Sequence, residues 1–294
     1  MRLFYCFNLL NNNDKQKIMA KRTTTGTTKQ AARTNTEKKQ KREKPPRMTE
    51  DEKNEKYGKK NFFLNYKINF KPLTQTQEDY YEMILSKRIT FGTGVAGSGK
   101  SFVCLAAALK LLREDNTYKK ILILTPTVEA GNMNIGFLKG SKEEKIQPYL
   151  EADFQTMNDI LDMSGNPADE IMKGLIENKL VMGDCVSFMR GKTIKNTIVI
   201  LTESENFDKQ EMMLLLSRIS PTSKYIINGD NRQQDRKDIK KSQQNGLKHA
   251  MDTLKGKVDQ IGFCHFLRKD IVRDPLIEEI MDAWYQGEEL NEEY

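Results

Sequence analysis

Short apolar runs alternate with longer helical patterns from residue 89 onward. The runs are rich in Ile, Leu and Val and lie at 89–92, 120–125, 180–186, 197–203 and 224–228. Continuous apolar runs of this kind are typical of strands buried on both faces of a parallel sheet. Between them the pattern predicts helices at 78–86, 102–112, 141–163, 169–177 and 209–219. This alternation predicts an α/β fold with a doubly wound, mostly parallel sheet.

The pattern is less regular at both ends of this region. Apolar residues alternate over 61–70, which predicts an entering strand, and 246–254, 258–263 and 274–285 predict a helix, a strand and a closing helix. Pro148 is expected to break the helix at 141–163, because proline lacks the N–H that a helix needs. Asp208 is expected to cap the helix that follows it.

Residues 1–60 differ from the rest in composition. They hold 17 Lys and Arg against 7 Asp and Glu, whereas residues 61–294 hold 31 against 34, so the net charge of +7 belongs to this segment. With little to bury, it is expected to be a disordered basic tail. Its run at 38–44 either binds polyphosphate or is a solvated tail. Met19 is the expected translation start, which would leave residues 1–18 untranslated.

Several classes of protein are disfavoured by what the chain lacks. No stretch approaches 18 apolar residues, so no membrane span is expected. The four cysteines are scattered and the histidines are His249 and His265, a pattern that supports neither a zinc site nor a disulfide framework. We therefore expect reduced cysteines in a cytoplasmic protein.

A glycine-rich segment follows the first apolar run. It satisfies G-x-x-x-x-G-K-[ST] with Gly94, Val95, Ala96, Gly97, Ser98, Gly99, Lys100 and Ser101. In such a phosphate-binding loop, successive backbone N–H groups point at one anion and the dipole of the next helix favours negative charge. Lys100 is expected to reach the β- and γ-phosphates and Ser101 to bind Mg²⁺. Because a strand precedes the segment and a helix follows it, we interpret it as a nucleotide site rather than a Gly/Ser connector.

Polar residues also follow the later apolar runs. Thr202 and Glu203 end one run, an arrangement in which a nucleotidase directs a carboxylate at Mg²⁺ and the attacking water. Asp230 and Gln233 follow the next run. Because open α/β sheets bind ligands at the carboxyl ends of their strands, all four are expected beside the phosphate loop.

A basic turn at 188–193 is the candidate for contact with nucleic acid. Arg190 and Lys192 flank Gly191, and their cations together with backbone N–H groups could hold a phosphate. Surface ion pairing is the alternative. Phe188 could stack on a base, although burial beside the strand is the expected role.

With these residues in view, the chain resembles the PhoH-like ATPase family from about residue 71 to residue 285. Five blocks stand in the family's order: 91–101, 128–131 with 136–138, 189–193, Gly229-Asp230 with Gln233, and 272–276. Their order also resembles the first RecA-like core of superfamily 1 helicases. The resemblance implies a RecA-like P-loop ATPase domain at 61–287, an acidic frayed tail at 288–294, and ATP and Mg²⁺ as cofactors.

The resemblance also implies roles for matching positions. Catalytic roles fall to Lys100, Glu203, Gln233 and Arg273; nucleotide contacts to Gln77, residues 94–101 and Asp230; and the metal to Ser101, Thr202 and Glu203. The amide of Gln77 can donate to and accept from an adenine edge, although a surface glutamine is the commoner case. Arg273 is a candidate arginine finger, with pairing to Asp270 or Asp274 as the alternative. Thr127, Arg190 and Lys192 are expected at single-stranded nucleic acid, with RNA favoured, and a homo-oligomeric ring is expected, with a hexamer as its candidate size.

Two positions depart from the family's pattern. Thr202 stands where the family has an aspartate before Glu203, so a hydroxyl without charge replaces a carboxylate that normally holds Mg²⁺, and metal affinity should fall. Thr125 stands where the family usually has an arginine before the proline, which weakens a backbone-phosphate contact or marks an ordinary turn.

Three functions remain open at this level. The leading one is a Mg²⁺-dependent ATPase that moves on or remodels single-stranded nucleic acid. The second is an ATP-gated binding or ring-assembly protein with little hydrolysis, for which Thr202 is the reason. The third is a small-molecule kinase, which Gly229-Asp230 with Gln233 and the lack of an arginine-rich lid disfavour.

Overall fold

A six-stranded sheet forms the centre of the fold. The computed structural model describes residues 63–126, 142–234, 245–272, 276 and 279. The strands lie in the order β3-β2-β4-β5-β1-β6, and every neighbouring pair is parallel. Their bounds are β1 (Ile89–Gly94), β2 (Lys120–Thr125), β3 (Val181–Cys185), β4 (Thr197–Leu201), β5 (Lys224–Gly229) and β6 (Ile261–Phe266). The predicted α/β class with a parallel sheet is confirmed.

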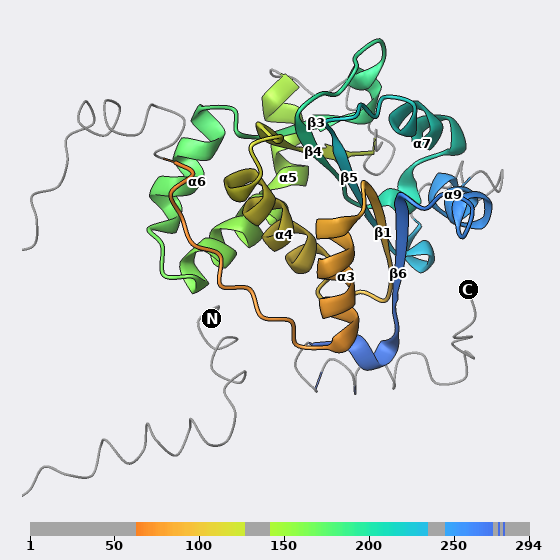
Figure 1. The fold of residues 1–294 in the computed structure, drawn as a ribbon, viewed down its shortest axis with the longest axis horizontal. Helices are drawn as coiled ribbons and strands as arrows, with labels where there is room; N and C mark the ends of the chain where they lie inside the picture. Colours follow the sequence, from red (N-terminus) through yellow and green to blue (C-terminus); the bar gives the residue numbers. More distant parts are fainter. Residues whose placement is uncertain (1–62, 127–141, 235–244, 273–275, 277–278, 280–294) are drawn as a thin grey trace, which may run out of the picture. The chain divides into compact units, whose positions relative to one another are not determined.

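Helices cover both faces of the sheet (Figure 1). They are α3 (Gln75–Ser86), α4 (Lys100–Glu114), α5 (Lys142–Met163), α6 (Ala168–Glu177), α7 (Lys209–Leu216) and α9 (Gly246–Leu254). In β4, Ile198 and Ile200 pack in the core with α3 to α6, whereas Val199 and Leu201 pack in a second core with α7 and α9. Because successive strand residues point to opposite faces, an unbroken apolar run supplies both cores.

The strand register brings three loops to one edge of the sheet. Thr93 of β1 pairs with Gly229 of β5, and Leu201 of β4 pairs with Ile227 of β5. β5 therefore lies between the strand that enters the phosphate loop and the strand that ends at Thr202. The carboxyl ends of all three strands deliver their following residues to the same place, as open α/β sheets do at a ligand site.

The entering segment is not the strand that its alternation predicts. Residues 65–72 are extended but pair with no strand, because their backbone bonds go to side chains between α5 and α6. Lys67 N donates to Asn166 Oδ1 (2.9 Å) and Asn69 N to Ser164 Oγ (2.9 Å), while the buried Tyr66 hydroxyl donates to Leu109 O (2.8 Å). Its apolar residues therefore pack on helices rather than in the sheet.

The break predicted at Pro148 is also wrong, since α5 runs through it. Proline removes one helical hydrogen bond, but the turns after it are held by apolar packing of Leu150, Met157, Ile160 and Leu161 in the core beside α4. The predicted cap is confirmed: Asp208 Oδ1 accepts from Glu211 N (2.8 Å), and Glu211 Oε2 accepts from Asp208 N (3.0 Å).

Some predicted features lie outside the described residues. They are the tails at 1–60 and 288–294, Thr127, Arg273 and most of the closing helix at 274–285. Within the part that is described, no helix is long and apolar enough to cross a membrane. Cys104, Cys185 and Cys264 are buried free thiols there.

Candidate functional site

The phosphate loop joins β1 to α4. Gly94, Gly97 and Gly99 have φ of 118°, 82° and 82°, values that residues with a side chain rarely adopt. Lys100 Nζ folds over the loop and donates to Gly94 O (2.8 Å) and Val95 O (2.7 Å). The first turn of α4 points its free N–H groups at the same space. This local geometry suits a bound phosphate.

Three distant segments hold the loop in place. Val95 N donates to Phe266 O (3.3 Å) at the end of β6, and Val272 N donates to Gly97 O (3.2 Å). From α3, Gln77 Nε2 donates to Ser98 O (3.0 Å). Because these contacts fix the backbone from both sides, the loop conformation is set by the fold and not by the loop sequence alone.

Gln77 lies beneath the phosphate loop rather than on the surface. It is 3% exposed, and its Oε1 accepts from Leu73 N (2.9 Å) while its Nε2 donates to Ser98 O. Recognition of adenine by this amide stays a prediction. The contacts in this structure make Gln77 a support for the loop.

A cavity of about 420 Å³ opens beside the phosphate loop. Its wall combines residues from the loop, from α5 and from the ends of β4 and β5; those used below are Lys100, Ser101, Asp153, Thr202, Glu203, Glu205, Asp230 and Gln233. The predicted nucleotide, metal and catalytic residues of the described chain, apart from Gln77 and part of the loop, thus meet at one site.

Glu203 enters this cavity on a left-handed backbone. Its φ of 51° and ψ of 43° are uncommon for a residue with a side chain and cost on the order of 1 kcal/mol. The turn ends β4 and starts a short 3₁₀ helix, η4 (Ser204–Asn206). Such strain persists where the surrounding fold imposes it, often at functional sites.

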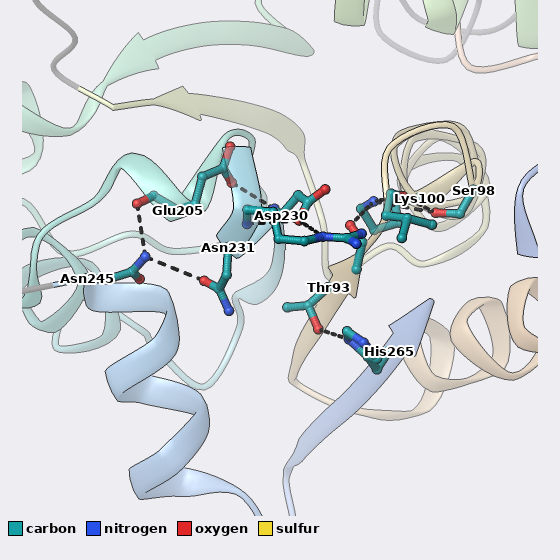
Figure 2. A network of polar contacts seen from close by, with 11 residues as sticks. Thr93, Ser98, Lys100, Glu205, Asp230, Asn231, Asn245 and His265 are labelled. Carbon is teal, nitrogen blue, oxygen red and sulfur yellow. Dashed lines mark hydrogen bonds and ion pairs between the residues drawn. The ribbon is translucent and has the colours of Figure 1, made fainter. Parts of the chain in front are cut away.

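A second glutamate lies behind Glu203. Glu205 is 1% exposed, its Oε2 accepts from Asp230 N (2.9 Å), and it shares a hydrogen bond with Glu203 (Figure 2). Burial first, and then the bond to and negative charge of Glu203, raise the pKa of Glu205 well above its usual range. Glu205 is therefore a neutral acid at pH 7. It ties the end of β5 to the turn after β4.

The amino group of Lys100 is electrostatically poised for an anion. Burial lowers its pKa to about 8, and the nearby carboxylates of Asp230, Glu205 and Glu203 oppose that shift. Asp230 itself is buried and pairs with Arg232, whose Nε lies 3.4 Å from Oδ1. A phosphate at the loop would add negative charge beside Lys100 and restore its protonation.

The cavity wall also suits a hard cation next to a phosphate. Mg²⁺ favours oxygen ligands and is held by one or two carboxylates with substrate phosphates and waters. The wall offers hydroxyls from Ser101 and Thr202 and the carboxylate of Glu203. Asn228 Nδ2 is a buried donor with no partner in the described chain. No group of three or more His, Cys, Asp or Glu residues that could hold a metal was found among the described residues.

The structure does not bring the basic turn to this cavity. Arg190 and Lys192 are exposed after η3 (Val186–Met189), and neither lines the wall. Phe188 is 44% exposed, so its predicted burial is wrong; it ends the turn's approach to solvent and not a core position.

Sequence reasoning missed two acidic residues of the site, Asp153 and Glu205. Asp153 lies on the apolar stripe of α5, three residues after Leu150 and four before Met157, and a charge on such a stripe was the available signal. Glu205 lies two residues after Glu203, and nothing in the sequence separates it from a surface carboxylate.

Comparison with known proteins matches most of this chain. Residues 69–285 match the family described as PhoH-like protein. A PhoH-like protein of Bacillus subtilis (strain 168) is 34% identical over 211 residues, 72% of this chain and 62% of that protein. One of Mycobacterium tuberculosis (strain ATCC 25618 / H37Rv) is 32% identical over 219 residues, 74% of this chain and 59% of that protein.

More distant similarities cover a comparable region. Protein PhoH of Escherichia coli (strain K12) is 28% identical over 212 residues, 71% of this chain and 56% of that protein. Among solved structures, the Pif1 helicase of Candida albicans is similar with a TM-score of 0.35 and 14% identity, over 72% of this chain and 44% of that one. The chain spans about 59% of the length of the mycobacterial relatives that it matches. By its match over residues 69–285, the chain belongs to the PhoH-like protein family.

Proposed function

We propose that this protein is a Mg²⁺-dependent ATPase that acts on single-stranded nucleic acid, with RNA favoured, and couples hydrolysis to movement or remodelling. The observation that carries this proposal is the meeting of the phosphate loop with Glu203, Asp230 and Gln233 on the wall of one cavity. A phosphate binder alone needs only the loop. A hydrolase also needs a carboxylate and polar groups near the terminal phosphate, and these line the same space.

The residues divide the work of hydrolysis. The loop N–H groups, the α4 dipole and Lys100 bind the phosphates and balance their charge. Ser101, Thr202 and Glu203 would hold Mg²⁺, which supplies positive charge to the β- and γ-phosphate oxygens. Glu203 orients the attacking water and accepts its proton. Asp230 and Gln233 face the γ-phosphate from the end of β5.

Contact with nucleic acid is proposed for the turn that carries Arg190 and Lys192. Both side chains are exposed and lie next to Gly191, whose φ of 74° gives the turn an open backbone. Cations that neutralise phosphates release counterions, so this contact should weaken with salt. A homo-oligomeric ring, with six subunits as its expected size, is part of the same proposal.

Phosphate release with and without single-stranded RNA tests the ATPase. We expect turnover that needs Mg²⁺, rises with RNA and is lost in Lys100→Ala. Turnover no higher than that of Lys100→Ala under both conditions would refute hydrolysis.

The nucleic-acid contact has its own test. Arg190→Ala with Lys192→Ala should weaken RNA binding and reduce its salt slope by about 2, one unit for each lost phosphate contact. The matched control removes the same charge from Lys255 and Lys257, which are exposed after α9. An equal loss in both double variants would show a general charge effect instead of a site.

Thr202 favours a second candidate, an ATP-gated binding or assembly protein with little turnover. Its hydroxyl brings no charge to the metal, and electrostatic stabilisation is usually the largest catalytic contribution. In that case ATP should drive RNA binding or ring formation at a fixed ratio to protein, without sustained phosphate release. Gel filtration with a slowly hydrolysed ATP analogue distinguishes this gate from a cycling ATPase.

A further inference from the structure

Asp153 places a carboxylate in the cavity from a helix that carries none of the predicted site residues. It lies on α5 and lines the same wall as Ser101, Thr202 and Glu203. Its side chain is 9% exposed. Within the described residues no hydrogen bond or ion pair engages it. A buried, unpartnered carboxylate thus faces the space beside the phosphate loop.

The environment of Asp153 is unfavourable for a structural acid. Taking a carboxylate out of water without a partner costs several kcal/mol. Burial, followed by the negative charge of Glu203, raises its pKa to about 7, so near neutral pH it is on the verge of losing its charge. A leucine at this place on the apolar stripe of α5 would avoid that cost. A cation in the cavity would instead offset it.

Thr202 leaves a matching deficit. It follows β4 and is buried, its backbone N donates to Leu124 O (3.2 Å), and its hydroxyl brings no charge to the metal side of the cavity. Glu203 is the carboxylate placed for the attacking water, so it does not replace a charge devoted to the metal. Mg²⁺ bound to a nucleotide takes one or two carboxylates in addition to phosphates and waters. The carboxylate on the wall that remains ionisable and uncommitted is Asp153.

We propose that Asp153 is the carboxylate that holds the nucleotide's Mg²⁺ in this chain, in place of the aspartate that Thr202 replaces. This inference rests on the proposed function, since it concerns the metal of the same nucleotide site. It assigns to α5 a charge that the end of β4 lacks. It also accounts for a buried acid on an otherwise apolar face of that helix.

The test is the Mg²⁺ dependence of nucleotide binding, which needs no turnover. A fluorescent ATP analogue is titrated in EDTA and at increasing Mg²⁺ with the full chain, Asp153→Asn and Asp162→Asn. Asp162 lies on the same helix, but exposed. In Asp153→Asn we expect the Mg²⁺ concentration that half-saturates the gain in affinity to rise by about tenfold or more, as for loss of a group that supports a metal. Asp162→Asn should leave it unchanged.

Binding in EDTA separates a metal role from a structural one. Removing a negative charge near a triphosphate should leave metal-free affinity unchanged or higher in Asp153→Asn, with no loss of melting temperature. A purely structural role would lower metal-free and metal-dependent binding together, and that result would overturn the proposal. So would a half-saturating Mg²⁺ within twofold of the unmodified chain.

Rescue provides the second variant. Thr202→Asp alone should lower the half-saturating Mg²⁺, and combined with Asp153→Asn it should return the value to within about threefold of the unmodified chain, since one carboxylate would replace the other. Failure of this rescue would show that Asp153 acts on something other than the same ion. Absence of nucleotide binding in the unmodified chain would instead refute the proposed function.

Discussion

Glu203 and Glu205 lie two residues apart after β4 and take different protonation states. Glu205 is buried and committed to Asp230 N, and its raised pKa keeps it neutral at pH 7. We expect Glu205→Gln to keep phosphate release within about threefold, because the amide preserves one acceptor and one donor. Glu203→Gln should lower it by about 100-fold or more, since the general base is lost. Nucleotide affinity, measured by fluorescence titration, should change little in either.

The two glutamine variants also control for one another. Each removes one carboxylate from the same turn with the same change of shape. If Glu205→Gln lost turnover as severely as Glu203→Gln while still binding nucleotide, Glu205 would have to act as an ionised carboxylate, contrary to its burial.

Nucleotide affinity should depend on pH through Lys100. Its pKa of about 8 in the free protein would rise when a phosphate arrives, so binding takes up a proton above pH 8. Affinity should therefore be constant below pH 8 and fall by up to tenfold per pH unit above it, where the triphosphate no longer titrates because its last pKa lies near 6. Calorimetry in buffers of different ionisation enthalpy measures the proton uptake directly.

Lys100→Arg is the matched variant for this pH effect. A guanidinium keeps its charge throughout the range, so any binding that it retains should be flat above pH 8. Measurement in the Glu205→Gln background removes the other group whose raised pKa lies in this window. A slope that persists in Lys100→Arg within that background would exclude Lys100 as its source.

At the scale of elements, the contact between the phosphate loop and β6 depends on Gly94. A Cβ there would lie 2.0 Å from Phe266 O, and the φ of 118° is itself unfavourable for a side chain. Gly94→Ala should cost more than about 3 kcal/mol in urea unfolding, because β6 must move from its partner strand. Gly165→Ala, with φ of 78° but nothing within 4 Å of its Cβ, should cost only about 1 kcal/mol. Similar costs would show that backbone conformation alone matters.

Elements with a strong local pattern could be predicted from the sequence, and those defined by tertiary contacts could not. The bounds of β2 and α9 match the apolar pattern because burial on both faces, or on one helical face, determines it. Residues 65–72 alternate like a strand, yet their N–H groups are satisfied by Asn166 and Ser164, which no local pattern indicates. Asp153 reaches the cavity only through the packing of α5, and so its place there was not predictable.

At the scale of the molecule, the phosphate loop is held from both ends of the described domain. Gln77 precedes β1, whereas Phe266 and Val272 follow nearly all of the sheet. Opening the loop therefore disturbs elements that are distant in sequence but packed in one domain. A nucleotide that tightens the loop should stabilise these segments together, by mass action, rather than ordering the loop alone.

The charge balance of the cavity bears on whether one subunit suffices for hydrolysis. Within the described residues, Lys100 is the cationic side chain on the cavity wall, and Arg232 is engaged with Asp230. Phosphoryl transfer commonly draws a further cation from an arginine of the same or a neighbouring chain. Arg273, outside the described residues, is the candidate for that charge, and a ring would allow it to act between subunits.

Mixing two inactive variants distinguishes these arrangements. Lys100→Ala subunits keep Arg273 but lack a working loop, whereas Arg273→Ala subunits keep the loop but lack the arginine. If Arg273 acts across a subunit boundary, an equal mixture reassembled at high concentration should regain about a quarter of normal phosphate release, since half of the sites are intact and half of those gain a competent neighbour. Specific activity of the unmodified protein should then also rise with its concentration. Arg273 acting within its own subunit predicts that the mixture stays at the sum of its parts at every concentration.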